Sequence, residues 1–174
     1  SINPGTGALS FLTPPDYETP VDFGADNVYD VTVQVSDGGF VTTQALAVTV
    51  LPLNDNAPVI TSNGGGVTAA VNVAENTTAV TTVTATDVDG PALTYSISGG
   101  AYAARVVLDS HGDALSFLSG PAYDAPADVG ADNVYEVTVL VSDGAFSDSQ
   151  ALSIAVLPVN DNEPIITSHG GPTT

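Results

Sequence analysis

Several residue types are missing or nearly missing from this sequence of 174 residues. It has no cysteine, methionine or tryptophan, and its single basic residue is Arg105. The absence of cysteine excludes disulfide bonds and thiolate metal ligands. Twenty acidic residues leave a formal net charge of −19, which excludes nucleic acid and anionic membranes as partners because like charges repel. No apolar run is long enough to cross a membrane as a helix.

The residues that are present favour short strands joined by turns. Hydrophobic residues make up 43% of the chain, which suffices for a core, and there are 17 glycines and 12 prolines. Valine and threonine are common, and both are typical of strands. The acidic surface should attract cations, although it also serves as an ordinary solvated surface.

A long internal repeat organises the chain. The sequence LPLNDNAPVIT at 51–61 returns as LPVNDNEPIIT at 157–167, and a shift of about 106 residues overlays the chain on itself. This period is domain-sized and predicts the back half of one repeat in residues 1–56, a complete repeat in 57–162, and the start of a further repeat or a tail in 163–174. The chain is therefore expected to be a segment of a longer protein.

The complete repeat reads as strands throughout, because apolar residues alternate with polar ones at a period of two. The alternating runs lie at residues 67–73, 80–83, 93–97, 115–117, 135–141 and 152–156. About seven short strands in roughly 100 residues predict an all-β fold of tandem seven-stranded Greek-key β-sandwiches. No segment has a helical period.

Residues 1–56 are expected to hold only the last strands of such a sandwich. Their apolar positions match those of the complete repeat, but no earlier strands of this chain can cover them. We expect this half to be completed by another chain or by polypeptide outside the sequence, because an open apolar face and unpaired strand edges are unfavourable.

Carboxylates and asparagines recur at strand ends and turns, where Ca²⁺ could bind. The segments that carry them are PDYE (15–18), NDN (54–56), VAEN (73–76), ATDVDG (85–90) and VSDG (141–144). Ca²⁺ takes six to eight oxygen ligands, and Asp-x-Asp offers two oxygens on one side of an extended segment. The alternative for each residue alone is an ordinary turn in which the side chain bonds its own backbone.

These segments occur in an order that resembles cadherin repeats, in their bacterial cadherin-like version. The resemblance implies Ca²⁺ at the joint between successive domains. The ligands that it implies for the first joint are Asp16, Glu18, the Leu53 carbonyl, Asn54, Asp55, Asn56, Asp87, Asp89 and Asp143. Those that it implies for a weaker second joint are Glu75, Asp124, Asn160, Asp161 and Asn162. The second joint is expected to be weaker because Ala122 replaces a ligand and no Asp-x-Asp follows.

The resemblance implies a calcium-stiffened extracellular or cell-surface module of a bacterial adhesin, matrix or filament protein, including those of biofilms. Neighbouring repeats of the same or an identical chain would be its partners, with a polysaccharide or cell-surface ligand as a further possibility. We expect no enzymatic activity, because His111 and His169 fit surface positions and no catalytic set is visible. The alternative function is a carbohydrate-binding module, for which Tyr102 in GGAYAAR is the candidate aromatic residue.

Overall fold

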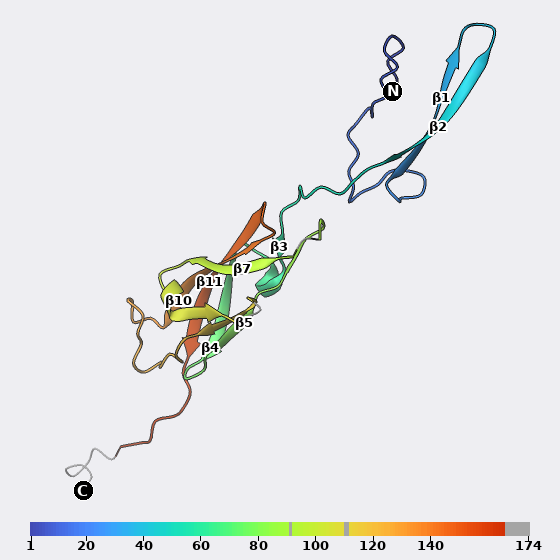
Figure 1. Ribbon diagram of the computed structural model, residues 1–174. Helices are drawn as coiled ribbons and strands as arrows, with labels where there is room; N and C mark the ends of the chain where they lie inside the picture. Colours follow the sequence, from blue (N-terminus) through green and yellow to red (C-terminus); the bar gives the residue numbers. More distant parts are fainter. Residues whose placement is uncertain (91, 110–111, 166–174) are drawn as a thin grey trace. The chain divides into compact units, whose positions relative to one another are not determined.

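The structure, a computed structural model, describes residues 1–90, 92–109 and 112–165 (Figure 1). The expectations for His111, for His169 and for the tail beyond residue 165 therefore lie outside the described residues. The chain divides into two compact units. The first unit contains Ser1–Asn56 and residues 88–90, and the second contains Ala57–Asp87 and the described chain from Ala92 onward. Among the described residues, no helix is long and apolar enough to span a membrane.

The first unit contains one antiparallel hairpin, made of β1 (Val28–Ser36) and β2 (Val41–Thr49). The pairing runs from Val28 opposite Thr49 to Ser36 opposite Val41. Asp37 closes the loop, since its Oδ1 accepts the backbone N–H groups of Gly39 at 2.9 Å and Phe40 at 2.8 Å. The apolar residues of both strands share one face because successive side chains alternate across a strand. These two strands confirm the all-β prediction locally.

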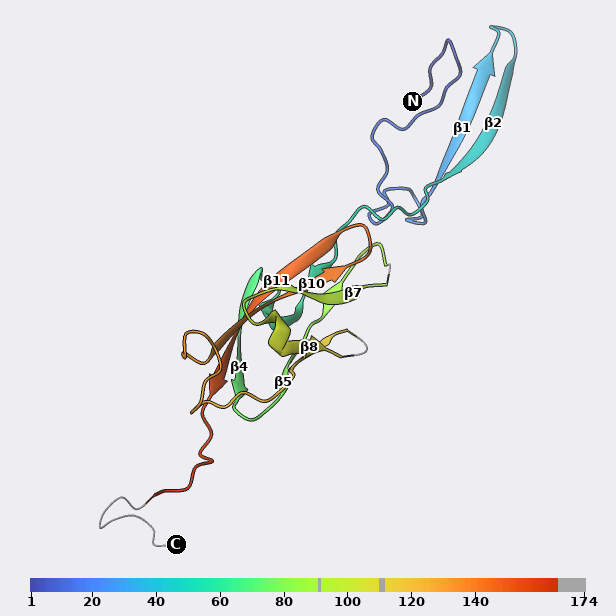
Figure 2. The same cartoon turned by 60° about the vertical axis from the view of Figure 1, so that its left-hand side comes forward.

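The second unit contains the remaining strands (Figures 1 and 2). They are β3 (Val59–Ile60), β4 (Thr68–Ala74), β5 (Ala79–Thr82), β6 (Ala85–Thr86), β7 (Thr94–Gly99), β8 (Val106–Leu108), β9 (Ala114–Phe117), β10 (Val134–Ser142) and β11 (Ser147–Leu157). One sheet has the order β4-β11-β10-β7, a second has β5-β9-β8, and β3 pairs with β6. Among the described strands, the pairings of the second unit are antiparallel except that of β4 with β11, which is parallel.

Six of the nine labelled strands of the described second unit match the six alternating runs of the sequence, namely β4, β5, β7, β9, β10 and β11. The strands β3, β6 and β8 were not predicted. The 3₁₀ turn η1 (Ser62–Gly64), which ends at Gly65 in the left-handed conformation (φ 67°), separates β3 from β4, and Val83 lies between β5 and β6. A further 3₁₀ turn, η2 (Ala103–Arg105), precedes β8. The segments β3, β6 and β8 have only two or three residues, too few for a period-two pattern to reveal them.

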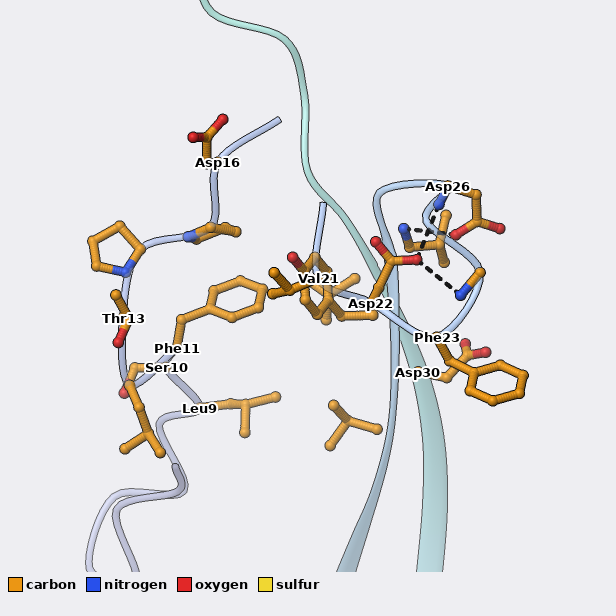
Figure 3. Close-up of a pocket in the computed structure, with 18 of the residues that line it drawn as sticks. Leu9, Ser10, Phe11, Thr13, Asp16, Val21, Asp22, Phe23, Asp26 and Asp30 are labelled. Carbon is orange, nitrogen blue, oxygen red and sulfur yellow. Dashed lines mark hydrogen bonds between the residues drawn. The ribbon is translucent and has the colours of Figure 1, made fainter. Parts of the chain in front are cut away.

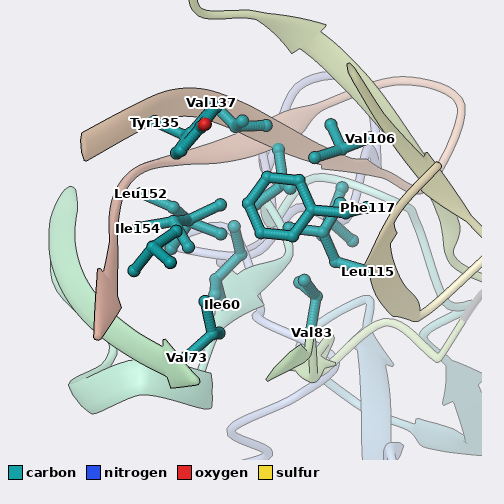
Figure 4. Packing of buried hydrophobic residues seen from close by; sticks show 13 residues of the cluster. Ile60, Val73, Val83, Val106, Leu115, Phe117, Tyr135, Val137, Leu152 and Ile154 are labelled. Carbon is teal, nitrogen blue, oxygen red and sulfur yellow. The ribbon is translucent and has the colours of Figure 1, made fainter. Parts of the chain in front are cut away.

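The core of the second unit lies between its two larger sheets (Figure 4). Thirteen buried hydrophobic residues form it: Ile60, Val73, Val83, Val106, Leu115, Phe117, Tyr135, Val137, Val139, Val141, Leu152, Ile154 and Val156. Tyr135 contacts two aromatic rings edge-on, with ring centroids 5.2 Å from Phe117 and 5.0 Å from Tyr102. Burying a side chain of this size contributes about 1.5–3 kcal/mol, so the alternating pattern of β10 and β11 stabilises this unit directly.

Candidate metal sites

Three predicted ligands of the first joint lie close together in the first unit. Glu18, Asp55 and Asp89 each place one carboxylate oxygen within 4.8 Å of the others, and we call them the first carboxylate cluster. Glu18 lies ahead of β1, Asp55 follows β2, and Asp89 lies between β6 and β7 in the chain. The cluster therefore joins three segments that are distant in sequence.

Asp89 is the centre of the hydrogen bonds in this cluster. Its Oδ2 accepts the backbone N–H groups of Asp55 at 3.0 Å and Asn56 at 2.8 Å. The Asn56 side-chain amide donates to Asp89 Oδ1 and to Asp55 Oδ1, both at 3.0 Å. The Asn-Asp-Asn segment is thus held against Asp89 by both backbone and side chain, which fixes the positions of two carboxylates without a basic residue nearby.

Desolvation, charge and hydrogen bonding within the first carboxylate cluster shift the pKa values of Glu18 and Asp89. Desolvation raises the pKa of Glu18, and the negative charges of Asp89 and Asp55 raise it further. Desolvation also opposes ionisation of Asp89, but the hydrogen bonds from Asn56 and Asp55 outweigh it and lower the pKa of Asp89. Hydrogen bonding therefore favours the ionised form of Asp89, whereas repulsion from Asp89 and Asp55 disfavours the ionised form of Glu18. A divalent cation would relieve this repulsion.

A second carboxylate cluster lies in the second unit, where Glu75, Asp124 and Asp161 approach one another within the same 4.8 Å. Glu75 follows β4 and Asp161 lies beyond β11. Because β4 and β11 are parallel, their carboxyl ends meet at one edge of the sheet. Asp124 and Asp161 occupy the positions that Glu18 and Asp55 hold one repeat earlier. The two clusters therefore share two of their three positions.

The second cluster is held by hydrogen bonds from neighbouring amides. Glu75 is only 3% exposed, and its two oxygens accept the backbone N–H groups of Tyr123 at 2.8 Å and Val159 at 2.7 Å. The Asn162 side-chain amide donates to Asp124 Oδ2 at 2.6 Å and to Asp161 Oδ1 at 2.9 Å. Asn162 thus links two of the acids as Asn56 does in the first cluster.

Other predicted ligands have local roles in turns. Asp16 Oδ1 accepts the backbone N–H groups of Glu18 at 3.0 Å and Thr19 at 3.3 Å. Hydrogen bonding from the Thr19 side chain, followed by these backbone N–H groups, outweighs desolvation and lowers the pKa of the Asp16 carboxyl. Asp143 Oδ1 accepts the backbone N–H groups of Ala145 and Phe146. Each of these acids thus forms the ordinary turn that was the alternative interpretation. Neither belongs to the groups of three close acids found among the described residues.

The remaining predicted ligands are placed by the linkers and the loop after β6. Leu53 and Asn54 follow β2, and Asn160 follows β11 at an exposed position. Asp87 lies between β6 and β7 and is half-buried. Within the described ranges, Asp87 is likewise outside the two clusters of three acids.

Asn76 is a site residue that the sequence analysis did not assign. Its side-chain amide donates to Asp161 Oδ2 at 2.6 Å, and its backbone N–H donates to the Pro121 carbonyl at 2.8 Å. Its φ of 60° is left-handed, a conformation that asparagine adopts more readily than most residues. The signal was present, since Asn76 directly follows Glu75, but only the fold brings it to Asp161.

Tyr102 does not form the exposed platform on which a carbohydrate site would rest. It is half-buried, its ring packs edge-on against Tyr135, and its hydroxyl oxygen accepts the Val129 backbone N–H at 2.8 Å. The residue packs against the core instead.

Comparisons with curated proteins point to cadherin repeats. The chain is 32% identical over 184 residues to Cadherin-related family member 2 of Mus musculus, covering 95% of this chain and 14% of that protein. It is 29% identical to Protocadherin Fat 4 of Homo sapiens, covering 96% of this chain and 3% of that protein. Chitinase A of Pseudoalteromonas piscicida is 36% identical over 117 residues, covering 67% of this chain and 12% of that enzyme. No protein-family model matches the chain.

Solved structures that resemble this chain also consist of cadherin domains. A structure of human Protocadherin-24 EC1-2 matches with a TM-score of 0.66 and 20% identity, covering 91% of this chain and 76% of that one. Extracellular cadherin domains 1–4 of Protocadherin Gamma B7 match with a TM-score of 0.62 and 25% identity, covering 82% and 35%. These similarities confirm the all-β sandwich fold without assigning the chain to a bacterial branch. The chain is therefore made of cadherin repeats.

Proposed function

We propose that this chain is a calcium-stiffened segment of an extracellular adhesion protein, with Ca²⁺ bound at the joint between successive repeats. The observation that carries the proposal is the first carboxylate cluster, Glu18, Asp55 and Asp89. Glu18 precedes the Asn-Asp-Asn linker, Asp55 lies within it and Asp89 follows it. An ion held by all three would tie the linker to the segments before and after it.

The chemistry of the cluster suits a hard divalent cation. Ca²⁺ prefers oxygen ligands, and Glu18, Asp55 and Asp89 supply carboxylates where no basic residue neutralises them. Asn54, Asn56 and the Leu53 carbonyl offer further oxygens in the same linker. Asp16, Asp87 and Asp143 complete the proposed set for the first joint, and Asn160 belongs to that of the second.

Binding would stabilise the joint by mass action. Extracellular calcium modules bind with dissociation constants of roughly 10⁻⁴–10⁻³ M. A free concentration about 100-fold above the dissociation constant stabilises the bound state by about 2.7 kcal/mol per site. That free energy is sufficient to convert a flexible linker into a mostly ordered one.

Calorimetric titration of the full chain with Ca²⁺ tests the proposal. We expect saturable binding that Asp89→Ala weakens at least about tenfold, which corresponds to about 1.4 kcal/mol. Asp30→Ala is the matched control, because Asp30 is an exposed acid on β1 outside the clusters. Small-angle scattering should show a narrower range of extensions when Ca²⁺ is added to the wild type, but not to Asp89→Ala.

Two results would contradict this proposal. If Asp30→Ala weakened binding as much as Asp89→Ala, the acids would act only through net charge. If scattering from the wild type were unchanged at saturating Ca²⁺, the ion would not stiffen the joint.

We further propose that the parent protein is secreted or displayed at a bacterial surface, in an adhesin, matrix, filament or biofilm. The similarity to a segment of Chitinase A supports a bacterial setting, whereas the similar Fat 4 and cadherin-related proteins are animal proteins. The neighbouring repeats of the same or an identical chain are its proposed partners. The chitinase similarity covers 12% of that enzyme, so it favours an accessory segment and not a catalytic domain.

The same similarity gives a reason to test polysaccharide binding. Chitin pull-down of the full chain is the direct measurement. If the chain is retained on chitin only with Ca²⁺, and Tyr102→Ala is retained equally well, adhesion through the repeats is favoured. Tyr102 packs against Tyr135 and is not expected to bind the polysaccharide itself.

A further inference from the structure

Turns in this chain are stabilised in two different ways. In the first unit, Asp22 holds its own turn, because its Oδ2 accepts the backbone N–H of Asp26 at 3.0 Å (Figure 3). The turn η1 lies between β3 and β4 of the second unit and is held instead by side chains from two other strands. We call residues 61–66, which contain η1, the η1 loop.

The side chain of Asn63 in this loop is held at both ends. Its Oδ1 accepts the Thr81 hydroxyl at 3.0 Å, and its Nδ2 donates to Gln150 Oε1 at 3.3 Å. Gln150 is fully buried, and its Nε2 donates to the carbonyls of Gly66 at 2.7 Å and Ser62 at 3.4 Å. Since Thr81 is on β5 and Gln150 on β11, these hydrogen bonds tie the η1 loop to both of the larger sheets.

The closed loop depends on these hydrogen bonds because other features oppose it. Asn63 has φ 52° and ψ 34°, a left-handed conformation that is unfavourable for residues with a Cβ, although less so for asparagine. The hydroxyl of Ser62 is buried and has no hydrogen-bond partner among the described residues. A buried polar group without a partner destabilises the state in which it is buried. Thr81 and Gln150 therefore supply what the loop itself lacks.

Asn63 is the one asparagine of the sequence that directly precedes a glycine. Asparagine deamidates when the backbone nitrogen of the next residue attacks its side-chain amide carbon. A following glycine favours this attack, because it has no Cβ to obstruct the approach. Gly64 is exposed, and a Cβ added to it would meet no atom within 4 Å. Neighbouring groups therefore do not crowd the Asn63–Gly64 peptide at this point.

The covalent steps need water as the only co-reactant. The Gly64 nitrogen loses its proton and forms a bond to Asn63 Cγ, the Cγ–Nδ2 bond breaks, and the amide group takes up a proton and leaves as ammonia. The product is a five-membered succinimide ring. Water then opens the ring, and it gives aspartate when the Cγ–N bond breaks and isoaspartate when the backbone C–N bond breaks.

The closed η1 loop opposes the first of these steps. Asn63 Cγ must move toward the Gly64 nitrogen, but Thr81 and Gln150 hold the two polar atoms attached to it. Departure of ammonia also requires that Nδ2 separate from Gln150. Attack therefore follows local opening of the loop, which can occur without unfolding of the whole unit.

We propose that Asn63 is a deamidation site controlled by the η1 loop, and that the product in turn holds the loop open. An aspartate carboxylate has only acceptors, so Gln150 Oε1 would face a second acceptor in place of a donor. If Gln150 turned its amide to donate to the carboxylate, the carbonyls of Ser62 and Gly66 would lose their partner. Isoaspartate would add a methylene to the main chain of a tight turn.

The modification would act on the entry to the repeat. The η1 loop connects β3, which follows the Asn-Asp-Asn linker, to β4. Deamidation does not reverse under these conditions, so each opening that leads to it would loosen this connection permanently. The proposal does not depend on whether the carboxylate clusters bind Ca²⁺.

The sequence restricts the site to one of the two loops of this kind. The segment that follows Asn63 by one period reads Ser168-His169-Gly170 where the η1 loop reads Ser62-Asn63-Gly64. Histidine has no side-chain amide and cannot form the succinimide ring. Deamidation would therefore distinguish one repeat from the next.

The first test measures whether the loop controls the reaction. The full chain is incubated at mildly alkaline pH, and mass spectrometry quantifies aspartate and isoaspartate at position 63. We expect the folded chain to react at least about tenfold more slowly than the chain unfolded in urea. Thr81→Val removes the hydroxyl that holds Asn63 and should accelerate the folded chain about fivefold or more. Thr82→Val is the matched control, because Thr82 is exposed on the same strand, and it should react like the wild type.

The second test measures whether the product keeps the loop open. The backbone N–H groups of Thr61 and Gly65 donate to the carbonyls of Thr84 at 2.8 Å and Ser62 at 3.0 Å, and their hydrogen exchange reports on the loop. In Asn63→Asp we expect this exchange to be about tenfold faster, with the β10 amides unchanged. Asn72→Asp makes the same change at an exposed position of β4 and should leave the exchange unchanged.

Faster deamidation in Thr81→Val and faster exchange in Asn63→Asp, with both controls like the wild type, support the proposal. Control by the loop is overturned if Thr81→Val reacts no faster than Thr82→Val. It is equally overturned if the folded and unfolded chains react at the same rate, or if the unfolded chain forms no product at Asn63. The effect of the product is overturned if Asn63→Asp exchanges no faster than Asn72→Asp.

Discussion

The two hairpins of this chain differ in what covers them far more than in sequence. In β10 the inward residue Val141 is fully buried, whereas its equivalent Val35 in β1 is 71% exposed. Both hairpins nevertheless have the same register and the same Asp-closed loop. Strand pairing and turn geometry therefore follow from local sequence, while burial depends on strands that lie elsewhere in the chain.

The largest expected effect comes from matched core substitutions. Leu152→Ala should lower the free energy of unfolding of the second unit by about 2–5 kcal/mol, because it leaves a cavity in a closed core. Leu46→Ala, at the equivalent position of the first unit, should cost less than about 1 kcal/mol, because Leu46 is only half-buried. Hydrogen exchange of the two hairpins measures both values. Equal costs would show that the apolar side of the β1–β2 hairpin is covered in solution.

A second comparison concerns positions 120 and 14. Gly120→Ala should destabilise the second unit by about 1–3 kcal/mol, because the new Cβ would press against the backbone of Asn76. Pro14→Ala should leave the first unit within about 0.5 kcal/mol of the wild type, as is usual for exposed sites. Urea denaturation followed by circular dichroism gives the first value, and exchange of the β1 amides gives the second. A stable Gly120→Ala variant would mean that the loop before β5 moves freely.

The two carboxylate clusters should differ in affinity for Ca²⁺. We expect the first cluster to bind more tightly, by about tenfold or 1.4 kcal/mol, because the second joint has Ala122 in place of a ligand. Asp124→Ala should then abolish only the weaker phase of a calorimetric titration, and Asp55→Ala only the tighter one. Loss of the tighter phase in Asp124→Ala would reverse the order.

The smallest expected effect is that of pH on Glu18. Desolvation, and then Asp89 and Asp55, raise its pKa in the folded state, so its ionisation opposes folding. Below the unfolded-state pKa of about 4.5, Glu18 is protonated and does not destabilise the folded state. As the pH rises through the higher folded-state pKa, Glu18 ionises and the folded state loses stability. Glu18→Gln should therefore slightly raise the thermal midpoint of the calcium-free first unit at pH 7 but not at pH 4. A lower midpoint at pH 7 would contradict this sign.

Much of the fold could be predicted from the sequence, since period two in 135–141 and 152–156 locates β10 and β11. The strands β3 and β6 could not, because two residues are too few to carry a period-two pattern. The parallel pairing of β4 with β11 is equally invisible to local pattern, since the two strands are separated by most of the repeat. Non-local pairing is decided by the packing of the whole sandwich.

Only part of the candidate sites could be predicted from the sequence, because the residues that meet in them are far apart along the chain. Glu18, Asp55 and Asp89 were included in the sequence-based set, and the structure brings them together. Asp143 has a turn role that its own sequence, VSDG, also explains. Asn76 was missed because its partner Asp161 lies 85 residues away. The sequence identifies the side chains that offer oxygen ligands, but the fold determines which of them lie close together.

The parallel ladder between β4 and β11 determines how a repeat would respond to tension. A force that pulls the two ends of the second unit apart acts on the amino end of β4 and on the carboxyl end of β11. Because these strands are parallel, the force slides one along the other and loads their seven paired positions together in shear. The β1–β2 hairpin is loaded differently, because Val28 and Thr49 are opposite each other at the open end and the pairs separate one after another. Forced unfolding is governed by the unfolding rate, so a complete repeat should resist tension that opens the lone hairpin.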